Sequence, residues 1–416
     1  MKESGLLWCG AIPKDWETTK GKYFMRILER PVKEDDEVIT CFRDGEVTLR
    51  SKRREDGFTI ALVEAGYQGI EPGDLVVHGM DGFAGAIGIS DSRGKGTPAL
   101  NVLDCIGNKR YYMYLLRVMA YTELFMSLAT GIRVRTCDTN WKKLREIDYL
   151  LPPKKEQNRI VSFLDYKCAE ISKTMADIQL QINTLEEYRN SIISEAVTHG
   201  LDSSATMKES GTPWCPHIPE HWQTTNPKAL FYLRNQRAFP GERQLTASQR
   251  HGIMYQDEFM ELENQQVVTV EKDFSILKHV EPNDFVISMR SFQGGLEYSE
   301  VSGCISSAYV MLIPNMDKVY PPFWKWFFKS SKYINAIQST TNLVRDGQAM
   351  RYANFVMVPL FIIPMDEQRH IAEYLNNKVS QIDAILADKR AQLATLEEYK
   401  KSLIFEYVTG KKEVPA

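Results

Sequence analysis

Residues 153–160 read PKKEQNRI, and residues 364–371 read PMDEQRHI. Both stretches fit the pattern P-x-x-E-Q-x-x-I, and each opens a long run without glycine or proline, over residues 156–198 and 367–408. A proline just before an unbroken mixture of polar and apolar residues is a helix-start signal. The sequence therefore predicts a long helix over each run.

Apolar residues recur every seven positions in both predicted helices. A period of 3.5 residues held over five to six heptads is typical of a coiled-coil seam, whereas a helix of a globular domain has a broader apolar stripe. Because the two helices share this register, we expect them to pair with each other; packing of each helix on its own domain is the alternative. Each helix of ~42 residues would be roughly 60 Å long. The predicted interface residues are Leu164, Ile171, Ile178, Leu185, Ile192, Leu375, Ile382, Leu396 and Leu403.

The chain also repeats itself outside the helices. Residues 1–20 read MKESGLLWCGAIPKDWETTK, residues 207–226 read MKESGTPWCPHIPEHWQTTN, and twelve of these twenty positions are identical. The helix openings and a shared LEEY segment recur at nearly the same offset. This period is far too long for a solenoid, so two homologous halves of about 206 residues are the simplest account.

Each half combines a mixed region with its helix. Residues 1–150 and 207–362 alternate short β-like runs with Gly and Asp turns, which is typical of a globular domain. We therefore expect an α+β protein with an internal pseudo-two-fold repeat. The predicted segments are a first domain at 1–150, a first helix segment at 151–206, a second domain at 207–362 and a second helix segment at 363–416.

Composition narrows the class of protein. With 43% hydrophobic and 25% charged residues, the chain is neither disordered, collagenous nor a disulfide scaffold. Its seven cysteines are an odd number without a C-x-x-C pair, as expected of reduced thiols in a cytoplasmic protein. The start lacks an apolar leader, and no apolar stretch approaches ~20 residues, so no membrane association is expected. The net charge of −3 argues against indiscriminate coating of nucleic acid but allows local basic surfaces.

Catalytic motifs are missing from the sequence. There is no G-x-x-x-x-G-K-[ST] loop and no H-E-x-x-H, and the seven histidines have no metal-ligand spacing. Residues 82–88 form a Gly-rich turn without the features of a dinucleotide site. Tyr320-Pro321-Pro322-Phe323 resembles the tetrapeptide of amino-methyltransferases, but a phenol replaces the required amide or carboxylate, and no methyl-donor loop accompanies it. We expect no catalysis, no metal and no cofactor in this chain.

The layout of two domains, each followed by a helix that opens with P-x-x-E-Q-x-x-I, resembles the specificity subunit of type I restriction–modification systems over the whole chain. A Pro-x-Asp turn before a strand supports the resemblance, and the second half departs from the first there, with Asn283 in place of Gly73. The residues that carry it are Pro153, Glu156, Gln157, Ile160, Pro364, Glu367, Gln368 and Ile371, with Ile12, Pro13 and Trp16 and their partners Ile218, Pro219 and Trp222.

The resemblance implies a non-catalytic subunit that binds double-stranded DNA. In that family the two domains are target-recognition domains, each reading half of an interrupted DNA site. The helices form an antiparallel spacer and dock methyltransferase (modification) subunits, for which two copies are expected here. Restriction/translocase subunits are further expected partners, and S-adenosylmethionine would be bound by the methyltransferase subunits.

Basic and amide side chains are the candidates for DNA contact. Lysine and arginine neutralise phosphates, and Arg and Gln read guanine and adenine edges. A solvated surface is the alternative for each cluster, including the basic groups around residues 133–145 and 325–332. The predicted DNA-binding residues are Arg43, Arg50, Lys52, Arg53, Arg54, Arg93, Lys95, Arg243, Arg250, Arg290, Gln293, Arg345, Gln348 and Arg351.

Two other classes of function stay open on the sequence alone. One is a coiled-coil adaptor whose domains bind protein rather than DNA. The other is a stand-alone DNA methyltransferase, which the missing methyl-donor loop disfavours. Neighbouring genes for an adenine methyltransferase and a helicase–nuclease would favour the specificity subunit over both.

Overall fold

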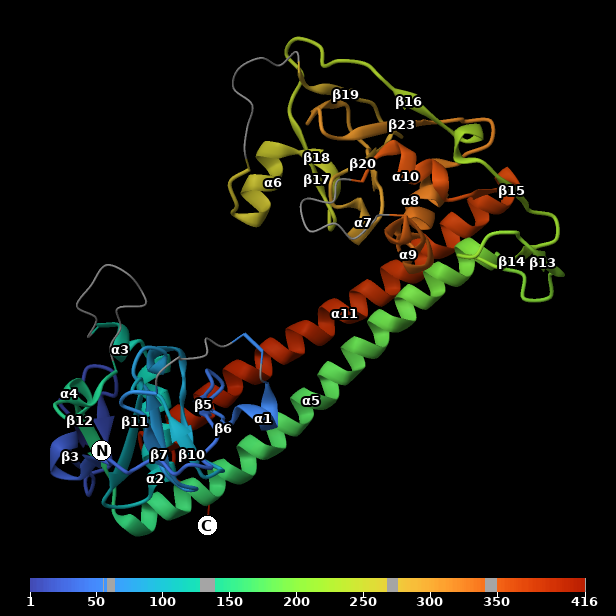
Figure 1. The fold of residues 1–416 in the computed structure, drawn as a ribbon. Coiled ribbons are helices and arrows are strands. Elements are labelled where there is room, and N and C mark those ends of the chain that lie inside the picture. Colours follow the sequence, from blue (N-terminus) through green and yellow to red (C-terminus); the bar gives the residue numbers. More distant parts are fainter. Residues whose placement is uncertain (55, 58–63, 128–138, 268–275, 341–349, 416) are drawn as a thin grey trace. The chain divides into compact units, whose positions relative to one another are not determined.

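The computed structural model describes residues 1–416 apart from 55, 58–63, 128–138, 268–275, 341–349 and 416. The chain forms two compact units, each built around part of two long helices (Figure 1). Unit 1 comprises Met1–Gln179 and Ala391–Ala416, and unit 2 comprises Leu180–Arg390. The predicted division into four segments stays a prediction.

Unit 1 runs from short strands into the first part of helix α5, and the last part of helix α11 (Met365–Val408) completes it. Its elements are β1 (Lys2–Glu3), β2 (Ala11–Ile12), β3 (Glu17–Lys20), η1 (Gly21–Tyr23), β4 (Met25–Ile27), β5 (Ile39–Cys41), β6 (Val47–Leu49), α1 (Arg50–Arg53), β7 (Gln68–Ile70), β8 (Leu75–His78), η2 (Gly82–Ala84), β9 (Ile87–Ile89), β10 (Gly94–Gly96), β11 (Leu100–Cys105), α2 (Lys109–Tyr121), α3 (Leu124–Ser127), α4 (Trp141–Leu144), β12 (Asp148–Leu151) and the first part of α5 (Lys154–His199).

Unit 2 follows the same plan: it begins with the last part of α5 and runs into the first part of helix α11. Its elements are β13 (Met207–Glu209), β14 (His217–Pro219), β15 (Gln223–Thr225), η4 (Pro227–Ala229), β16 (Phe231–Arg234), β17 (Leu245–Ser248), β18 (Gly252–Tyr255), α6 (Gln256–Glu263), β19 (Lys278–Val280), β20 (Phe285–Ile287), α7 (Ser291–Gly294), β21 (Glu297–Tyr298), β22 (Gly303–Ile305), β23 (Val310–Pro314), α8 (Pro321–Lys329), α9 (Ser331–Ser339), α10 (Tyr352–Met357), β24 (Leu360–Ile362) and the first part of α11 (Met365–Val408).

The sheets of the two units have the same topology. A four-stranded antiparallel sheet has the order β4-β11-β8-β9 in unit 1 and β16-β23-β20-β21 in unit 2. The hairpins β5–β6 and β17–β18 also correspond, as do the pairs β3–β12 and β15–β24. The predicted α+β fold with an internal repeat is confirmed.

One helix covers the four-stranded sheet in each unit. In α2, residues Tyr111 to Leu116 are buried in one core with the sheet and the long helices, and in α8 the rings of Phe323, Trp324, Phe327 and Phe328 are completely buried. Burying an aromatic or large aliphatic side chain contributes about 2 kcal/mol. Packing of these helices therefore stabilises each sheet, and the sheet in turn positions the loops at the ends of its strands.

The two long helices run antiparallel beside each other within each unit. In unit 1, the rings of Phe163 and Tyr407 lie 4.4 Å apart, and Lys400 donates to Ser172 at 2.8 Å. In unit 2, Arg189 donates to Asp383 at 2.8 Å. Each helix begins at the residue after its proline, and together they form the predicted antiparallel pair. Among the predicted interface residues, Leu185, Ile192 and Leu396 are half-buried, and the buried ones are Leu164, Ile171, Ile178, Leu375, Ile382 and Leu403.

Candidate nucleic-acid interface

The Glu-Gln pair that opens each long helix joins that helix to its domain. Glu156 accepts a hydrogen bond from the indole Nε1 of Trp16 at 2.9 Å, and Glu367 accepts one from Trp222 at 3.0 Å. A carboxylate is favoured at this place because the N-terminus of a helix is the positive end of its dipole. The Ile-Pro-x-x-Trp and P-x-x-E-Q patterns are thus the two halves of one contact, made once in each unit.

The glutamine next to each glutamate is buried and holds the helix that covers the sheet. Gln157 accepts from the backbone N–H of Asn108, the N-cap residue of α2, at 2.9 Å. Gln368 accepts from the backbone N–H of Tyr320, the N-cap residue of α8, at 2.8 Å. Gln368 also accepts from the indole of Trp324. Long helix, covering helix and sheet therefore form one connected body in each unit.

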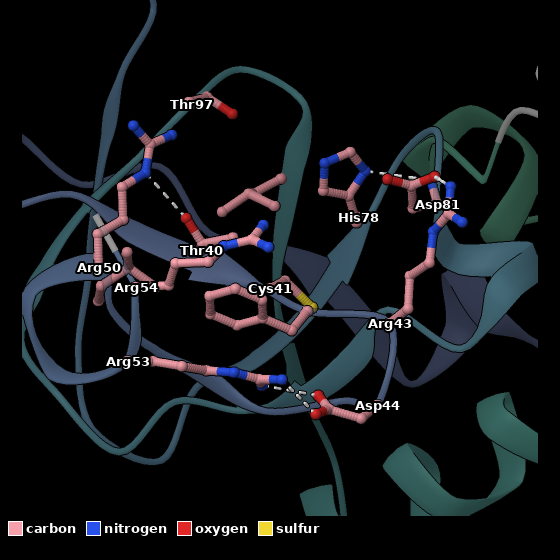
Figure 2. A pocket seen from close by; sticks show the side chains of 13 residues that line it. Thr40, Cys41, Arg43, Asp44, Arg50, Arg53, Arg54, His78, Asp81 and Thr97 are labelled. Carbon is pink, nitrogen blue, oxygen red and sulfur yellow. Dashed lines mark hydrogen bonds and ion pairs between the residues drawn. The ribbon is translucent and has the colours of Figure 1, made fainter. Parts of the chain in front are cut away.

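Four of the predicted DNA-binding residues line one cavity in unit 1. We call residues 39–54 the arginine hairpin; it contains β5, β6 and α1 and faces a cavity of about 480 Å³. Figure 2 shows Arg43 and His78 on one side of this cavity and Arg50 and Arg54 on the other. Lys52 lies on α1 of the same hairpin.

Carboxylates hold several of these cations in place. Arg43 is 63% exposed and pairs with Asp81 at 2.9 Å. Arg53 pairs with Asp44 at 2.6 Å, and its guanidinium lies 4.0 Å from the centre of the Phe42 ring. Such exposed pairs are worth at most about 1 kcal/mol, so a phosphate can compete for the arginine at small cost.

Two further hairpin cations contact hydroxyl groups. Arg50 donates from Nε to the hydroxyl of Thr40 at 3.0 Å. Lys52 donates to Ser92 at 2.6 Å and lies 3.5 Å from Asp91. The hairpin therefore presents oriented guanidinium groups, which suits bidentate recognition of phosphate or guanine.

His78 adds a neutral donor to the cavity wall. The backbone N–H groups of Met80 and Asp81 donate to its Nδ1 at 3.2 and 3.1 Å, which places the ring proton on Nε2. Burial lowers the pKa of His78, and the Asp81 carboxylate only partly opposes this effect. At pH 7 the neutral ring can thus donate one hydrogen bond from Nε2.

Arg93 and Lys95 do not line this cavity and are bound to carboxylates. Arg93 donates to Asp36 at 3.0 Å and also contacts Glu71. The Asp36 side chain is only 2% exposed, and its pKa is lowered chiefly by the hydrogen bond from Arg93. Lys95 pairs with Glu64 at 2.8 Å. A DNA phosphate could therefore bind Arg93 only by displacing the carboxylates that already hold it.

In unit 2 the predicted residues are spread over several elements. Arg243 pairs with Asp257 and stacks 3.5 Å from the centre of the Tyr255 ring. Arg250 is 80% exposed, with Glu263 at 3.5 Å. Arg290 and Gln293 are exposed at α7, Arg351 is exposed before α10, and Arg345 and Gln348 lie outside the described residues.

The helix that follows the hairpin carries opposite charge in the two units. Helix α1 has Arg50, Lys52 and Arg53, whereas its counterpart α6 has Asp257 and Glu258 in its first turn. A polyanion is attracted by the first charge pattern and repelled by the second. The arginine hairpin is therefore the stronger nucleic-acid candidate, and α7 is the better candidate in unit 2.

Neither a metal-binding cluster nor a helix suited to spanning a membrane occurs in the described part of the chain. No group of three or more His, Cys, Asp and Glu residues there could hold a metal ion. Among the described helices, none combines the length and the apolar character needed to cross a membrane.

Sequence reasoning missed one set of contacts. It identified the Trp, Glu and Gln positions as motifs, but not that they bind one another. The common offset between the two copies of each pattern was the signal that could have paired them.

Comparisons with known proteins give structural relatives only. None of the protein-family profiles matches the sequence, and no curated protein matches it. A chain of a solved structure described as "Structural basis underlying complex assembly and conformational transition of the type I R-M system" is 12% identical, with a TM-score of 0.68 over 97% of this chain and 100% of that chain. The HsdS subunit from Thermoanaerobacter tengcongensis is 14% identical, with a TM-score of 0.49 over 99% of this chain and 100% of its own. Over almost its whole length, this protein thus has the fold of a chain from a type I restriction–modification system.

Proposed function

We propose that this protein is the specificity subunit of a type I restriction–modification enzyme. The observation that carries the proposal is the shared fold, which covers 97% of this chain and all of the type I chain. In this role the protein binds double-stranded DNA in the cytoplasm and reads an interrupted site, one half by each unit. Modification subunits, in two copies, and restriction/translocase subunits assemble on it.

The charge distribution supports DNA as the ligand. The arginine hairpin gathers Arg43, Arg50 and Arg54 around one cavity, although the whole chain carries a net charge of −3. Local basic surfaces of this kind give affinity for phosphates, and base edges are then read by side chains such as Gln293. The modification subunits supply the remaining contacts with DNA.

The protein itself is proposed to be non-catalytic. S-adenosylmethionine is bound by the modification subunits, and no residue of this chain takes part in methyl transfer. This protein contributes by holding the target DNA in a fixed position relative to the modification subunits, as residues that bind but do not react do in an enzyme.

Salt-dependent DNA binding by the assembled complex tests the proposal. The protein is purified with its modification subunit, and its affinity for a DNA carrying the methylated site is measured at several salt concentrations. In a plot of log K against log salt, each lost phosphate contact makes the slope shallower by about 0.9. The triple variant R43A/R50A/R54A should lose two to three such contacts.

A matched variant controls for charge alone. Lys173 is exposed on α5, and Lys173→Ala should leave the slope unchanged. If the triple variant keeps the slope of the wild-type complex, the arginine hairpin does not contact DNA. If the wild-type complex binds the site no better than random DNA, the proposed function is wrong.

A further inference from the structure

A basic residue occupies the same place in the covering helix of both units. Arg117 is the ninth residue after Asn108, the N-cap of α2, and Lys329 is the ninth after Tyr320, the N-cap of α8. Both helices follow the second strand of a sheet with the same strand order. Sequence analysis assigned no role to Arg117, and it placed Lys329 in a basic cluster for which phosphate contact and a solvated surface were the two alternatives.

Arg117 ties the arginine hairpin to the sheet. Its Nε donates to the carbonyl of Ile87 in β9 at 2.8 Å, and its Nη2 donates to the carbonyl of Asp44 in the hairpin turn at 2.9 Å. Gly45 has a positive φ of +86°, and a Cβ there would lie 1.3 Å from the Arg117 guanidinium. The turn favours glycine because of this positive φ, and the Arg117 guanidinium lies directly against it.

Lys329 also contacts the last strand of the four-stranded sheet in its unit, but the loop that it holds is α7 rather than the counterpart of the arginine hairpin. Its Nζ donates to the carbonyl of Gly294 at the end of α7 at 2.9 Å and to Glu297 in β21 at 2.6 Å. A Cβ on Gly295, which has a φ of +77°, would lie 2.0 Å from the carbonyl of Phe328. Here too a glycine allows the loop to approach the end of the covering helix closely.

These contacts continue a chain that starts at the long helices. Gln157 and Gln368 hold the N-caps of α2 and α8, and those helices carry Arg117 and Lys329. Each unit therefore has an unbroken series of hydrogen bonds and packed residues from long helix to loop. Hydrogen bonds from a charged donor are stronger than those between neutral groups, so both contacts hold their loops firmly.

We propose that Arg117 and Lys329 are equivalent positioning residues, which fix the arginine hairpin and α7 relative to the sheet and thereby set the base preference of each half-site. This inference rests on the proposed function for its second part only. Neither residue needs to touch DNA, because each acts through the loop that it holds.

Hydrogen exchange of the full-length protein tests the positioning directly. Arg117→Met keeps most of the side-chain stem and removes both hydrogen bonds. The amides of Phe42 and Gly45, which bond within the turn at 2.8 Å, should then exchange at least about tenfold faster. Lys329→Met should do the same for the amides of Gln293 and Gly295.

Two variants serve as controls for the loss of a cation. Arg110 lies on α2 but pairs with Asp165 of α5, and Lys228 is exposed in unit 2. Arg110→Met and Lys228→Met should leave exchange in both loops unchanged. Lys329→Arg keeps a charged donor and should restore most of the protection at α7. Unchanged loop exchange in both Arg117→Met and Lys329→Met overturns the positioning role.

The methylated sites of the assembled complex test the second part. With Arg117→Met, the base preference in one half-site should relax by about tenfold while the other half keeps its preference. Lys329→Met should relax the opposite half. A general loss of folding would weaken both halves together, so this readout separates positioning from stability.

The two failures can be told apart. Faster loop exchange with both half-sites unchanged overturns the claim that these residues set base preference. A wild-type complex without any sequence-specific methylation instead refutes the proposed function, and the exchange result still decides whether Arg117 and Lys329 position the loops.

Discussion

Replacing the buried Gln368 by methionine should destabilise unit 2 by several kcal/mol. The side chain is fully buried and makes four strong contacts. It accepts from the backbone of Tyr320 at 2.8 Å and from the indole of Trp324 at 3.0 Å, and it donates to the carbonyls of Lys318 and Ile363 at 2.8 Å. Methionine has a similar volume, so little of the effect would come from a cavity.

The magnitude follows from the donors left without a partner. A buried donor without an acceptor costs about 1–3 kcal/mol, so two such donors give a loss of about 4 kcal/mol. Gln157→Met should cost about half as much in unit 1, because only the N–H of Asn108 would lose its one strong acceptor. The difference between the two units is itself part of the prediction.

The assay has to distinguish the units, because a chain with two units need not unfold in one step. Hydrogen exchange of the slowest amides in β23 and β11 reports the free energy of opening of unit 2 and unit 1 separately. Gln381 is exposed on the same helix as Gln368, and Gln381→Met is the matched control. If Gln368→Met costs no more than this control, the glutamine does not hold the covering helix.

Three further predictions concern unit 1 and the whole chain. The hydrogen bond from Arg93 lowers the pKa of Asp36, so this interaction stabilises the folded protein above about pH 4 and is lost as the pH falls through the folded-state pKa. In urea unfolding, Asp36→Asn should therefore be less stable than wild type at pH 7, and the difference should disappear at acid pH. Gly410→Ala should cost about 2 kcal/mol more than Gly5→Ala in thermal unfolding, since both have positive φ but only the Gly410 Cβ would meet Pro13, at 2.5 Å. The purified chain alone should transfer no methyl group from labelled S-adenosylmethionine to DNA, and robust transfer would contradict a non-catalytic role.

The sequence predicted the long helices and the internal repeat because both depend on local or periodic patterns. A heptad period and a proline before it define a helix without any knowledge of its partner. The sheets were not predictable in this way, since strands of three or four residues carry too little pattern to identify their neighbours. The order β4-β11-β8-β9 joins segments that lie far apart in the chain.

The candidate site could be predicted only in part for a related reason. Sequence reasoning can identify a basic residue but cannot see which carboxylate lies beside it. Arg93 was predicted to contact DNA, and the structure adds that it pairs with Asp36, which is 57 residues away in sequence. By contrast, Arg43, Arg50, Arg53 and Arg54 were predicted from one stretch of sequence, and a hairpin and a short helix bring them to one cavity.

The most direct test of the central claim is a map of methylated sites after one domain has been exchanged. The complete protein is expressed with its modification subunit, and residues 1–150 are replaced by the equivalent domain of a relative with a different site. The proposal predicts an interrupted methylated site in which one half changes and the other half is kept. A site in which both halves change together, or in which neither changes, would contradict the claim that each unit reads its own half.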